Sequence, residues 1–300
     1  MTADRSASVL ARLLTLAKRS GENYNLLLNR FALERLLHRL SVSEHSKSFL
    51  LKGALLFSLW YDQPHRPTRD ADLLGFGPDD AGQLVATFRD IAAIDLDDAI
   101  DFDLDTVRAE RIREDNVYGG MRLRLIGRIG SARCSLHIEV GFGDAVTPEP
   151  LTVSYPTLLP DFDAPALRVY PVYTVIAEKF QAMVRLGMAN TRMKDFYDLI
   201  TIADRTELDG ATLAGAIAAT FDHRKTALPG EPPLALKKAF GADVAKQRQW
   251  HAFLNRNRLE APDLTKVVGQ LYTLLWPATQ VAASRSAATA RWSPSRLKWS

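Results

Sequence analysis

Two runs of alternating apolar and polar residues lie near the middle of the chain. Apolar residues occupy every second position in 121–125 and in 134–140, and polar or charged residues stand between them. A period of two puts alternate side chains on opposite faces of a strand. Because Gly127 and Gly130 separate the runs, the pattern predicts an antiparallel hairpin with one apolar and one polar face. Residues 68–74, which stop at a glycine, have the character of another strand.

Helical spacing of apolar residues predominates toward both ends of the chain. Within residues 5–45, apolar residues recur every three to four positions, which predicts two helices that pack on the rest of the protein. Residues 54–60 and 78–94 are also predicted to be helical, and the second of these segments opens with a proline. The region 172–277 is helical in pattern and contains no convincing strand.

Six prolines between positions 148 and 171 break both periods and mark a boundary. We therefore predict an α+β chain with a mixed sheet followed by a helical domain. Its expected parts are N-terminal helices that pack on the core (1–45), a mixed-sheet core (46–150), a Pro-rich connection (151–171), a helical domain (172–280) and a basic, flexible tail (281–300).

The composition narrows the class of protein. Of the 300 residues, 47% are hydrophobic and 24% are charged, which argues against a disordered, collagen-like or coiled-coil chain. The single cysteine, Cys134, cannot close an intrachain disulfide, so we expect the protein in the reducing cytoplasm. We also expect Cys134 to lie in the core. The longest uncharged stretch, 267–284, contains glycine, proline and glutamine, and residues 1–20 lack the features of a secretory signal. We expect neither a membrane span nor export.

The net charge of +3 is concentrated in the tail. Residues 281–300 hold four basic side chains and no acid, together with Trp292 and Trp299, so the rest of the chain is close to neutral. Basic and aromatic side chains together can bind RNA through its phosphates and bases. Four charges spread over this length make a weak patch, however, and a frayed terminus is the favoured interpretation.

Asp70 and Asp72 are the first candidates for chemistry. In a strand they present both carboxylates on one face, while Ala71 and Leu73 face the core. Neighbouring carboxylates repel each other unless a cation lies between them, and Mg²⁺ is commonly held by one or two carboxylates plus substrate phosphates. The spacing indicates a metal site, although an Asp-x-Asp pair alone is more often structural.

Glu139 lies on the polar face of the second hairpin strand, together with His137 and Arg133. If this strand lies beside the Asp70 strand, Glu139 is a third carboxylate. It could bind a second metal ion or take the proton from an attacking hydroxyl, as two-metal phosphoryl or nucleotidyl transfer requires. The alternative is the solvated polar face of an antiparallel sheet.

Lys179 falls on the apolar stripe of the first helix after the proline-rich stretch. An ammonium group that emerges from such a stripe at a cleft can contact a triphosphate. In the next helix, Lys194 and Asp198 are spaced for an i,i+4 ion pair, and Asp195 lies on the same side as Asp198. The alternative is an ion-paired helix surface without a functional role.

Other common motifs are missing from the sequence. The six histidines show no zinc-ligand spacing. The chain has neither a Gly-x-x-x-x-Gly-Lys-Ser/Thr loop nor a Gly-x-Gly-x-x-Gly motif, so P-loop and dinucleotide-binding functions lose support.

Taken in order, these elements resemble the nucleotidyltransferase toxin family related to the abortive-infection toxin AbiEii, which includes mycobacterial toxins with the same core. The resemblance extends from residue 23 to residue 203 and is carried by the segments NYNLLLNRFALERLLHRLSVS, FLLKGALLFSLW, RPTRDADLLGFG, LHIEVGFGDAVTPEP, AEKFQAMVRLG and RMKDFYDL. It implies a DNA-polymerase-β-like nucleotidyltransferase mixed sheet with flanking helices and a C-terminal helical domain. Members of the family act as toxins in toxin–antitoxin pairs.

The resemblance also implies roles for individual residues. Metal binding would rest on Asp70 and Asp72, with Glu139 as a further acid. Catalysis and nucleotide binding would involve Lys52, Gly53, Lys179, Lys194, Asp195 and Asp198. The chain departs from the family at two positions: Lys52 is followed by Gly-Ala-Leu where relatives often have Gly-Gly, and Glu139 stands where they often have aspartate.

The expected protein is therefore a cytoplasmic, Mg²⁺-dependent nucleotidyltransferase toxin in which Mn²⁺ could replace Mg²⁺. It would transfer a nucleotide from a nucleoside triphosphate to RNA, at the 3′ end of tRNA, and so block translation. The expected partners are tRNA and a cognate antitoxin, with neither membrane association nor stable DNA binding. Two alternatives remain open: transfer to a protein or small molecule, and a nucleotide- or RNA-binding module without catalysis.

Overall fold

The computed structural model describes residues 2–61, 66, 68, 70–112, 120–286 and 290–300. The chain divides into two compact units. Unit 1 consists of Met1–Gly143 and Pro150–Tyr170, and unit 2 consists of Asp144–Glu149 and Pro171–Ser300.

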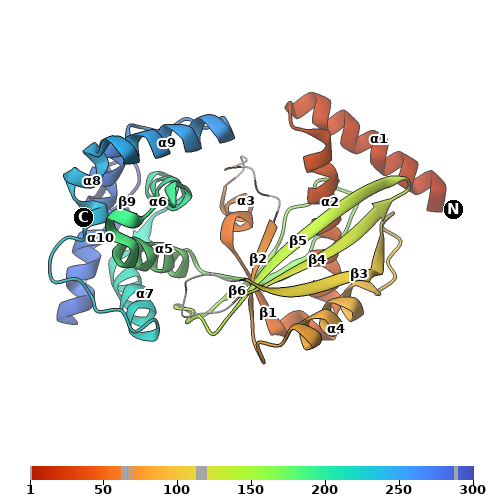
Figure 1. The fold of residues 1–300 in the computed structure, drawn as a ribbon, viewed down its shortest axis with the longest axis horizontal. Helices are drawn as coiled ribbons and strands as arrows, with labels where there is room; N and C mark the ends of the chain where they lie inside the picture. The colour runs from red at the N-terminus through yellow and green to blue at the C-terminus, as the bar shows by residue number, and fades with distance from the viewer. Residues whose placement is uncertain (1, 62–65, 67, 69, 113–119, 287–289) are drawn as a thin grey trace. The chain divides into compact units, whose positions relative to one another are not determined.

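Unit 1 is a mixed sheet of seven described strands with helices packed on one face (Figure 1). Its helices are α1 (Thr2–Ser20), α2 (Tyr24–Val42), α3 (Phe57–Trp60) and α4 (Ala81–Ala92). Its strands are β1 (Phe49–Lys52), β2 (Asp70–Gly75), β3 (Asp101–Ile112), β4 (Gly120–Ile129), β5 (Ala132–Phe142), β6 (Leu151–Ser154) and β7 (Ala166–Val169). The spatial order is β3-β4-β5-β2-β1-β7-β6.

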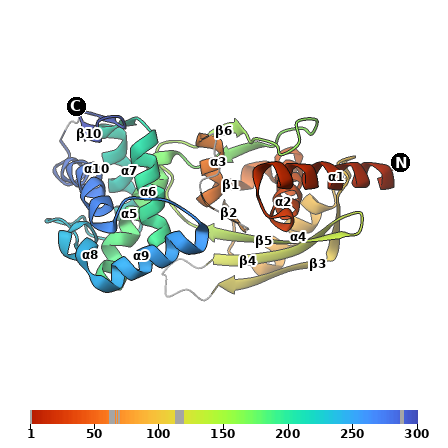
Figure 2. The same cartoon turned by 90° about the horizontal axis from the view of Figure 1, so that it is seen from above.

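The predicted hairpin is confirmed as β4 and β5, which pair antiparallel with Leu123 opposite Ile138. Strand β2 lies in the middle of the sheet, parallel to β5 and antiparallel to β1. The apolar side chains of these strands are buried, and α1, α2 and α4 cover that face (Figure 2). The opposite face carries the polar side chains of the same strands, so the alternation seen in the sequence separates core from surface.

The proline-rich region differs from the expected connection. Residues 151–170 belong to unit 1, where β6 and β7 extend the sheet beyond β1, and only the last residue of the expected connection, Pro171, belongs to unit 2. Strand β7 pairs parallel to β1 and buries Leu167 and Val169. The prolines flank these short strands and do not interrupt them. Proline has no backbone N–H to donate, so it is tolerated at positions where the strand does not pair.

Strand β3 was not predicted as a strand. It forms the edge of the sheet beside β4, and most of its side chains are exposed or half-buried. Its register against β4 shifts between Asp103 and Arg108, which breaks the simple alternation. An edge strand of this kind lacks the clear apolar and polar pattern that identified its neighbours.

Unit 2 is mainly helical, as expected from its sequence. Its helices are α5 (Val172–Leu186), α6 (Met193–Arg205), α7 (Gly210–His223), α8 (Lys238–Ala242), α9 (Val244–Asn257) and α10 (Leu264–Ser284). Three short strands form a small sheet: β8 (Leu208–Asp209), β9 (Arg291–Ser293) and β10 (Lys298–Trp299). Aromatic side chains fill the core, including the stacked rings of Phe196 and Phe240.

The flexible tail predicted for residues 281–300 is wrong for its described C-terminal part. Strand β9 pairs with both β8 and β10, and Trp292 is only 1% exposed. The indole N–H of Trp292 donates to the carbonyl of Ala203 at 2.8 Å, and that of Trp299 donates to the carbonyl of Leu274 at 3.1 Å. The buried Trp292 ring is therefore part of the unit 2 core and not a free surface for stacking on RNA bases.

Cys134 lies in the core of unit 1, as its place in the alternation predicted. Its thiol is fully buried against α2, and burial raises its pKa to about 11, so the protonated form persists at neutral pH. Within the ranges that the structure describes, no helix has both the length and the apolar character needed to cross a bilayer.

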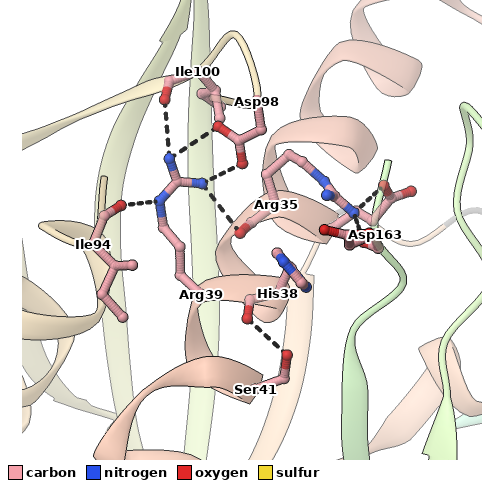
Figure 3. A network of polar contacts seen from close by, with 9 residues as sticks. Arg35, His38, Arg39, Ser41, Ile94, Asp98, Ile100 and Asp163 are labelled. Atoms are coloured by element: carbon pink, nitrogen blue, oxygen red, sulfur yellow. Dashed lines mark hydrogen bonds and ion pairs between the residues drawn. The ribbon is translucent and has the colours of Figure 1, made fainter. Parts of the chain in front are cut away.

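A buried arginine attaches α2 to the segment that leads into β3 (Figure 3). The Arg39 guanidinium donates to both carboxylate oxygens of Asp98, at 2.6 and 3.0 Å. It also donates to the main-chain carbonyls of Ile94, Ile100 and Arg35. A charge removed from water is costly unless such partners replace the solvent, and here each donor direction is met.

We predict that Arg39→Met lowers the free energy of unfolding of unit 1 by about 3–5 kcal/mol, because it leaves Asp98 buried without its partner. The measurement is urea unfolding followed by labelling of Cys134, whose thiol is buried in this unit.

The matched control is Arg12→Met. Arg12 pairs with Asp161, but both side chains are substantially exposed, so the expected loss is below about 1 kcal/mol. Equal losses in the two variants would contradict the prediction.

Candidate functional site

A row of charged side chains crosses the polar face of the unit 1 sheet. Lys52 at the end of β1 is the register partner of Asp72 on β2. Asp72 is in turn opposite Glu139 on β5, and Glu139 is opposite Arg122 on β4. Side chains at paired positions lie on the same face and within reach of one another. The Glu139 strand therefore does lie beside the Asp70 strand, and residues far apart in sequence meet in one row.

Asp70 stands one pleat away from Asp72 on the same face of β2. Both are partly exposed, whereas Ala71 and Leu73 are buried, as their alternation predicted. The Oδ1 atom of Asp70, a side chain that is 47% exposed, lies 3.3 Å from Nδ1 of His137 on β5. This end of β2 thus presents two carboxylates on one face, with an imidazole beside the first.

Gly53 forms the turn that follows β1 and lies against the Asp72 carboxylate. Its φ of +75° is in the region that favours glycine. A Cβ atom at this position would lie 1.9 Å from Oδ2 of Asp72, so no other residue leaves the carboxylate in place. The 3₁₀ turn Gly53–Leu56 begins at this glycine. The backbone N–H groups of its first residues are directed outward from the start of the turn.

Lys52 directly precedes this turn and is extended. Its Nζ atom lies 5.7 Å from the centre of the buried Tyr170 ring, a cation–π distance. The aromatic ring therefore stabilises the ammonium group of the lysine that pairs with Asp72 in the sheet register. A lysine, a glycine turn and two strand acids are the groups through which a protein can bind phosphates and an associated cation.

The acids Asp70 and Asp72 fit a divalent cation of the Mg²⁺ type. That ion accepts one or two protein carboxylates and takes its remaining ligands from water and substrate phosphates. The Gly53 turn leaves the space that the Asp72 carboxylate needs. In the described part of the chain, no group of three or more His, Cys, Asp or Glu side chains could hold a metal ion. The candidate centre is therefore a two-carboxylate set that would be completed by other oxygen ligands.

Glu139 lies beside Asp72, but its carboxylate is paired with an arginine. Its Oε1 atom accepts a hydrogen bond from Nη2 of Arg122 at 2.6 Å. This hydrogen bond raises the pKa of Arg122. Strand pairing predicted the position of Glu139 correctly, whereas the arginine opposite it was not recognised as its partner. In this arrangement Glu139 orients Arg122.

Unit 2 contains a buried ion cluster between α5 and α6. The Lys179 ammonium lies 2.7 Å from Oδ1 of Asp195 and 2.8 Å from Oδ2 of Asp198. Both aspartates are buried, and the Lys179 side chain is 14% exposed. The second oxygen of Asp195 accepts a hydrogen bond from Nε of Arg192 at 2.7 Å.

The i,i+4 ion pair that the spacing of Lys194 and Asp198 allows does not form in the structure. Asp198 turns inward to Lys179, while Lys194 is exposed and has no ion-pair partner within the described ranges. The i,i+4 spacing allowed the surface pair, but a lysine on the neighbouring helix competes for the same carboxylate in a less solvated place. Arg192 was missed, although its i,i+3 spacing from Asp195 was visible in the sequence.

Lys179 and Asp195 remain charged despite their burial. Burial alone lowers the pKa of Lys179, but Asp195 and Asp198 outweigh it and hold this pKa above its ordinary value. Burial alone raises the pKa of Asp195, but Lys179 and Arg192 hold it below its ordinary value. Mutual pairing therefore compensates for the water that these groups lose.

A mixed sheet that carries a Lys-Gly turn and paired acids, followed by a helical unit with a lysine–aspartate cluster, is the arrangement that the resemblance in the sequence implied. The profile of the family described as nucleotidyl transferase AbiEii toxin, type IV toxin–antitoxin system, matches residues 35–284. The chain belongs to this family. Its enzyme class is nucleotidyltransferase, and the family implies a nucleoside triphosphate substrate and a cognate antitoxin.

Two solved structures from Helicobacter pylori resemble the chain. JHP933 has a TM-score of 0.50 at 14% identity, over 88% of this chain and 95% of that one, and shows that the fold is shared. A second protein, described as a candidate nucleotidyltransferase, has a TM-score of 0.49 at 14% identity, over 89% of this chain and 100% of that one. No relative among curated proteins matches the chain.

We predict that Gly53→Ala destabilises unit 1 more than Gly21→Ala does. Both glycines have similar positive φ values, +75° and +72°, so the backbone strain is matched. Only at Gly53 does the new Cβ meet another group, the Asp72 carboxylate. The expected extra loss is about 1–3 kcal/mol, typical of overpacking, and urea unfolding with Cys134 labelling measures it. Equal losses at both positions would contradict the close approach.

We also predict a pH-dependent difference between the wild type and Asp195→Asn. The folded pKa of Asp195 lies below its ordinary value of 3.8, so its contribution is present above that pH and is lost as the pH falls through the folded pKa. The wild type should be more stable at about pH 5 and above, and the difference should shrink below pH 3.8 as its carboxylate is protonated.

Tryptophan fluorescence during thermal unfolding measures this difference, because four of the five tryptophans belong to unit 2. A difference that stays constant down to the lowest accessible pH would show that the Asp195 charge does not stabilise the cluster.

Proposed function

We propose that the chain is a Mg²⁺-dependent toxin that transfers a nucleotide from a nucleoside triphosphate to the 3′ end of tRNA and thereby blocks translation. Its proposed location is the cytoplasm, where tRNA is found. The observation that supports the proposal most strongly is the contact between the Gly53 turn and Asp72, with Lys52 and Asp70 beside them.

Each of these residues has a distinct part in the proposed reaction. Asp70 and Asp72 would hold Mg²⁺, or Mn²⁺ in its place, which when bound would supply positive charge to offset the phosphate oxygens. Lys52 and the N–H groups of the Gly53 turn bind and orient the phosphates. The acceptor hydroxyl attacks the α-phosphorus and releases its proton to water, the bond between the α-phosphorus and the oxygen that bridges to the β-phosphate breaks, and pyrophosphate leaves. Positioning and charge compensation supply most of the rate, since little covalent help is needed.

Glu139 is not included in the proposed metal set. Its Oε1 atom already accepts a 2.6 Å hydrogen bond from the Arg122 guanidinium, whose positive charge disfavours a second cation on the same carboxylate. Asp70 and Asp72 carry the proposal without it. The proposed role of Glu139 is to orient Arg122 on the face that bears the two acids.

In unit 2, Lys179 is the proposed phosphate-binding group. An ammonium has three N–H donors, and Asp195 and Asp198 occupy two of them. Within the described ranges the third donor has no partner, so it remains for an anionic ligand. Lys194 is exposed on the first turn of α6 and can add charge to the same region, whereas Asp198 acts through Lys179.

We predict that Asp70→Asn lowers nucleotide transfer at least a hundredfold without unfolding the chain, because the amide cannot replace an anionic metal ligand. The measurement is incubation with each labelled nucleoside triphosphate, Mg²⁺ and purified tRNA, followed by a denaturing gel. Asp101→Asn is the matched control, since Asp101 is an exposed aspartate on the edge strand of the same sheet and should retain transfer.

Full tRNA labelling by Asp70→Asn would refute the metal assignment. Label that appears on protein or on a small molecule instead of tRNA would replace the proposed acceptor. Triphosphate binding without release of pyrophosphate, in the presence of Mg²⁺ and total RNA, would support the non-catalytic alternative.

A further inference from the structure

Arg192 is held in place from two sides at the start of α6. Its main-chain N–H donates to the side-chain oxygen of Asn190 at 2.9 Å, and its Nε donates to Asp195 at 2.7 Å. The main-chain carbonyl of Asn190 accepts a hydrogen bond from the buried Lys246 ammonium at 2.9 Å. Both the backbone and the guanidinium of Arg192 are thereby oriented before any ligand arrives.

The guanidinium keeps an open edge. Only Nε is used by Asp195, and the Arg192 side chain is 41% exposed. Among the residues that the structure describes, its two Nη groups have no hydrogen-bond partner. A planar guanidinium that is fixed through Nε presents its Nη donors in a geometry that suits phosphate oxygens.

Asp195 lacks the exposure expected of a group that reacts with substrate. It is 0% exposed, and each of its carboxylate oxygens already accepts a hydrogen bond, one from Lys179 and one from Arg192. Burying a carboxylate is costly, and here the carboxylate connects two cations that would otherwise repel each other. It keeps both cations close together, with donors left for a ligand.

We infer that Arg192 is a phosphate-binding residue of unit 2 that acts with Lys179 on a nucleoside triphosphate, and that Asp195 is the positioning residue for both. The ligand identity rests on the proposed function, whereas the assignment of Arg192 rests on its anchored and open guanidinium. A polyphosphate offers enough anionic oxygens to engage two neighbouring cations at once.

The test is isothermal titration of the full chain with each of the four α,β-methylene nucleoside triphosphates, in the presence of Mg²⁺. For the triphosphate that binds the wild type, Arg192→Ala should weaken affinity about tenfold to a hundredfold, the loss expected for charge-assisted hydrogen bonds. Arg192→Lys should recover part of this loss, because it restores the charge without the guanidinium fork. Arg256→Ala is the control, since Arg256 is an exposed arginine of the same unit. The affinity of this variant for the triphosphate should equal that of the wild type.

A double-mutant cycle tests the positioning role of Asp195. If Asp195 acts through Arg192, the affinity losses of Asp195→Asn and Arg192→Ala are less than additive in the double variant. Strictly additive losses would overturn this role, because Asp195 would then act independently of Arg192.

Unchanged triphosphate affinity in Arg192→Ala, with or without a lower melting temperature, would overturn the phosphate-binding role. So would a wild type that binds none of the four triphosphates. A wild type that shows Arg192-dependent binding but transfers no label to tRNA would refute the proposed function and leave this inference standing.

Discussion

The register of β2 against its two neighbours is the constraint on which the candidate site depends. Strand β2 is antiparallel to β1 and parallel to β5, which puts Lys52, Asp72 and Glu139 in one row. Side chains alternate between faces, so a slip of one residue in β2 would turn both acids into the core and expose Ala71 and Leu73. The buried apolar face therefore determines, at the same time, where the carboxylates meet.

Buried carboxylates orient cations in both units. Asp98 holds the Arg39 side chain of α2 in unit 1, and Asp195 holds Lys179 and Arg192 in unit 2. Such pairs are weak evidence of net stability, because desolvation offsets much of the attraction. Their clearer effect is geometric, since each carboxylate accepts hydrogen bonds that restrict a long, flexible side chain. In unit 2 this restriction falls on the side chains best suited to bind phosphates.

Local patterns predicted the elements that have two distinct faces. The β4–β5 hairpin, the central strand β2 and the helical character of unit 2 follow from periods of two and 3.6 residues. These patterns did not predict the edge strand β3, the added strands β6 and β7, or the C-terminal strand β9. Short or exposed strands gain their stability from pairing partners that are distant in sequence. The tail illustrates this difference, since Trp292 is buried only because β8 and α6 provide a strand partner and a carbonyl acceptor.

The sequence by itself determined which residues could carry the chemistry: a lysine before a glycine, two acids two positions apart, and a lysine and aspartates in the helical region. It also determined, through resemblance, the family to which they belong. Only the tertiary structure decided the partners of these residues. Arg122 takes the Glu139 carboxylate, Lys179 takes Asp198 away from Lys194, and Arg192 joins Asp195. The physical reason is that spacing along a chain limits which pairs can form, whereas burial and competition among all nearby charges decide which pairs do form.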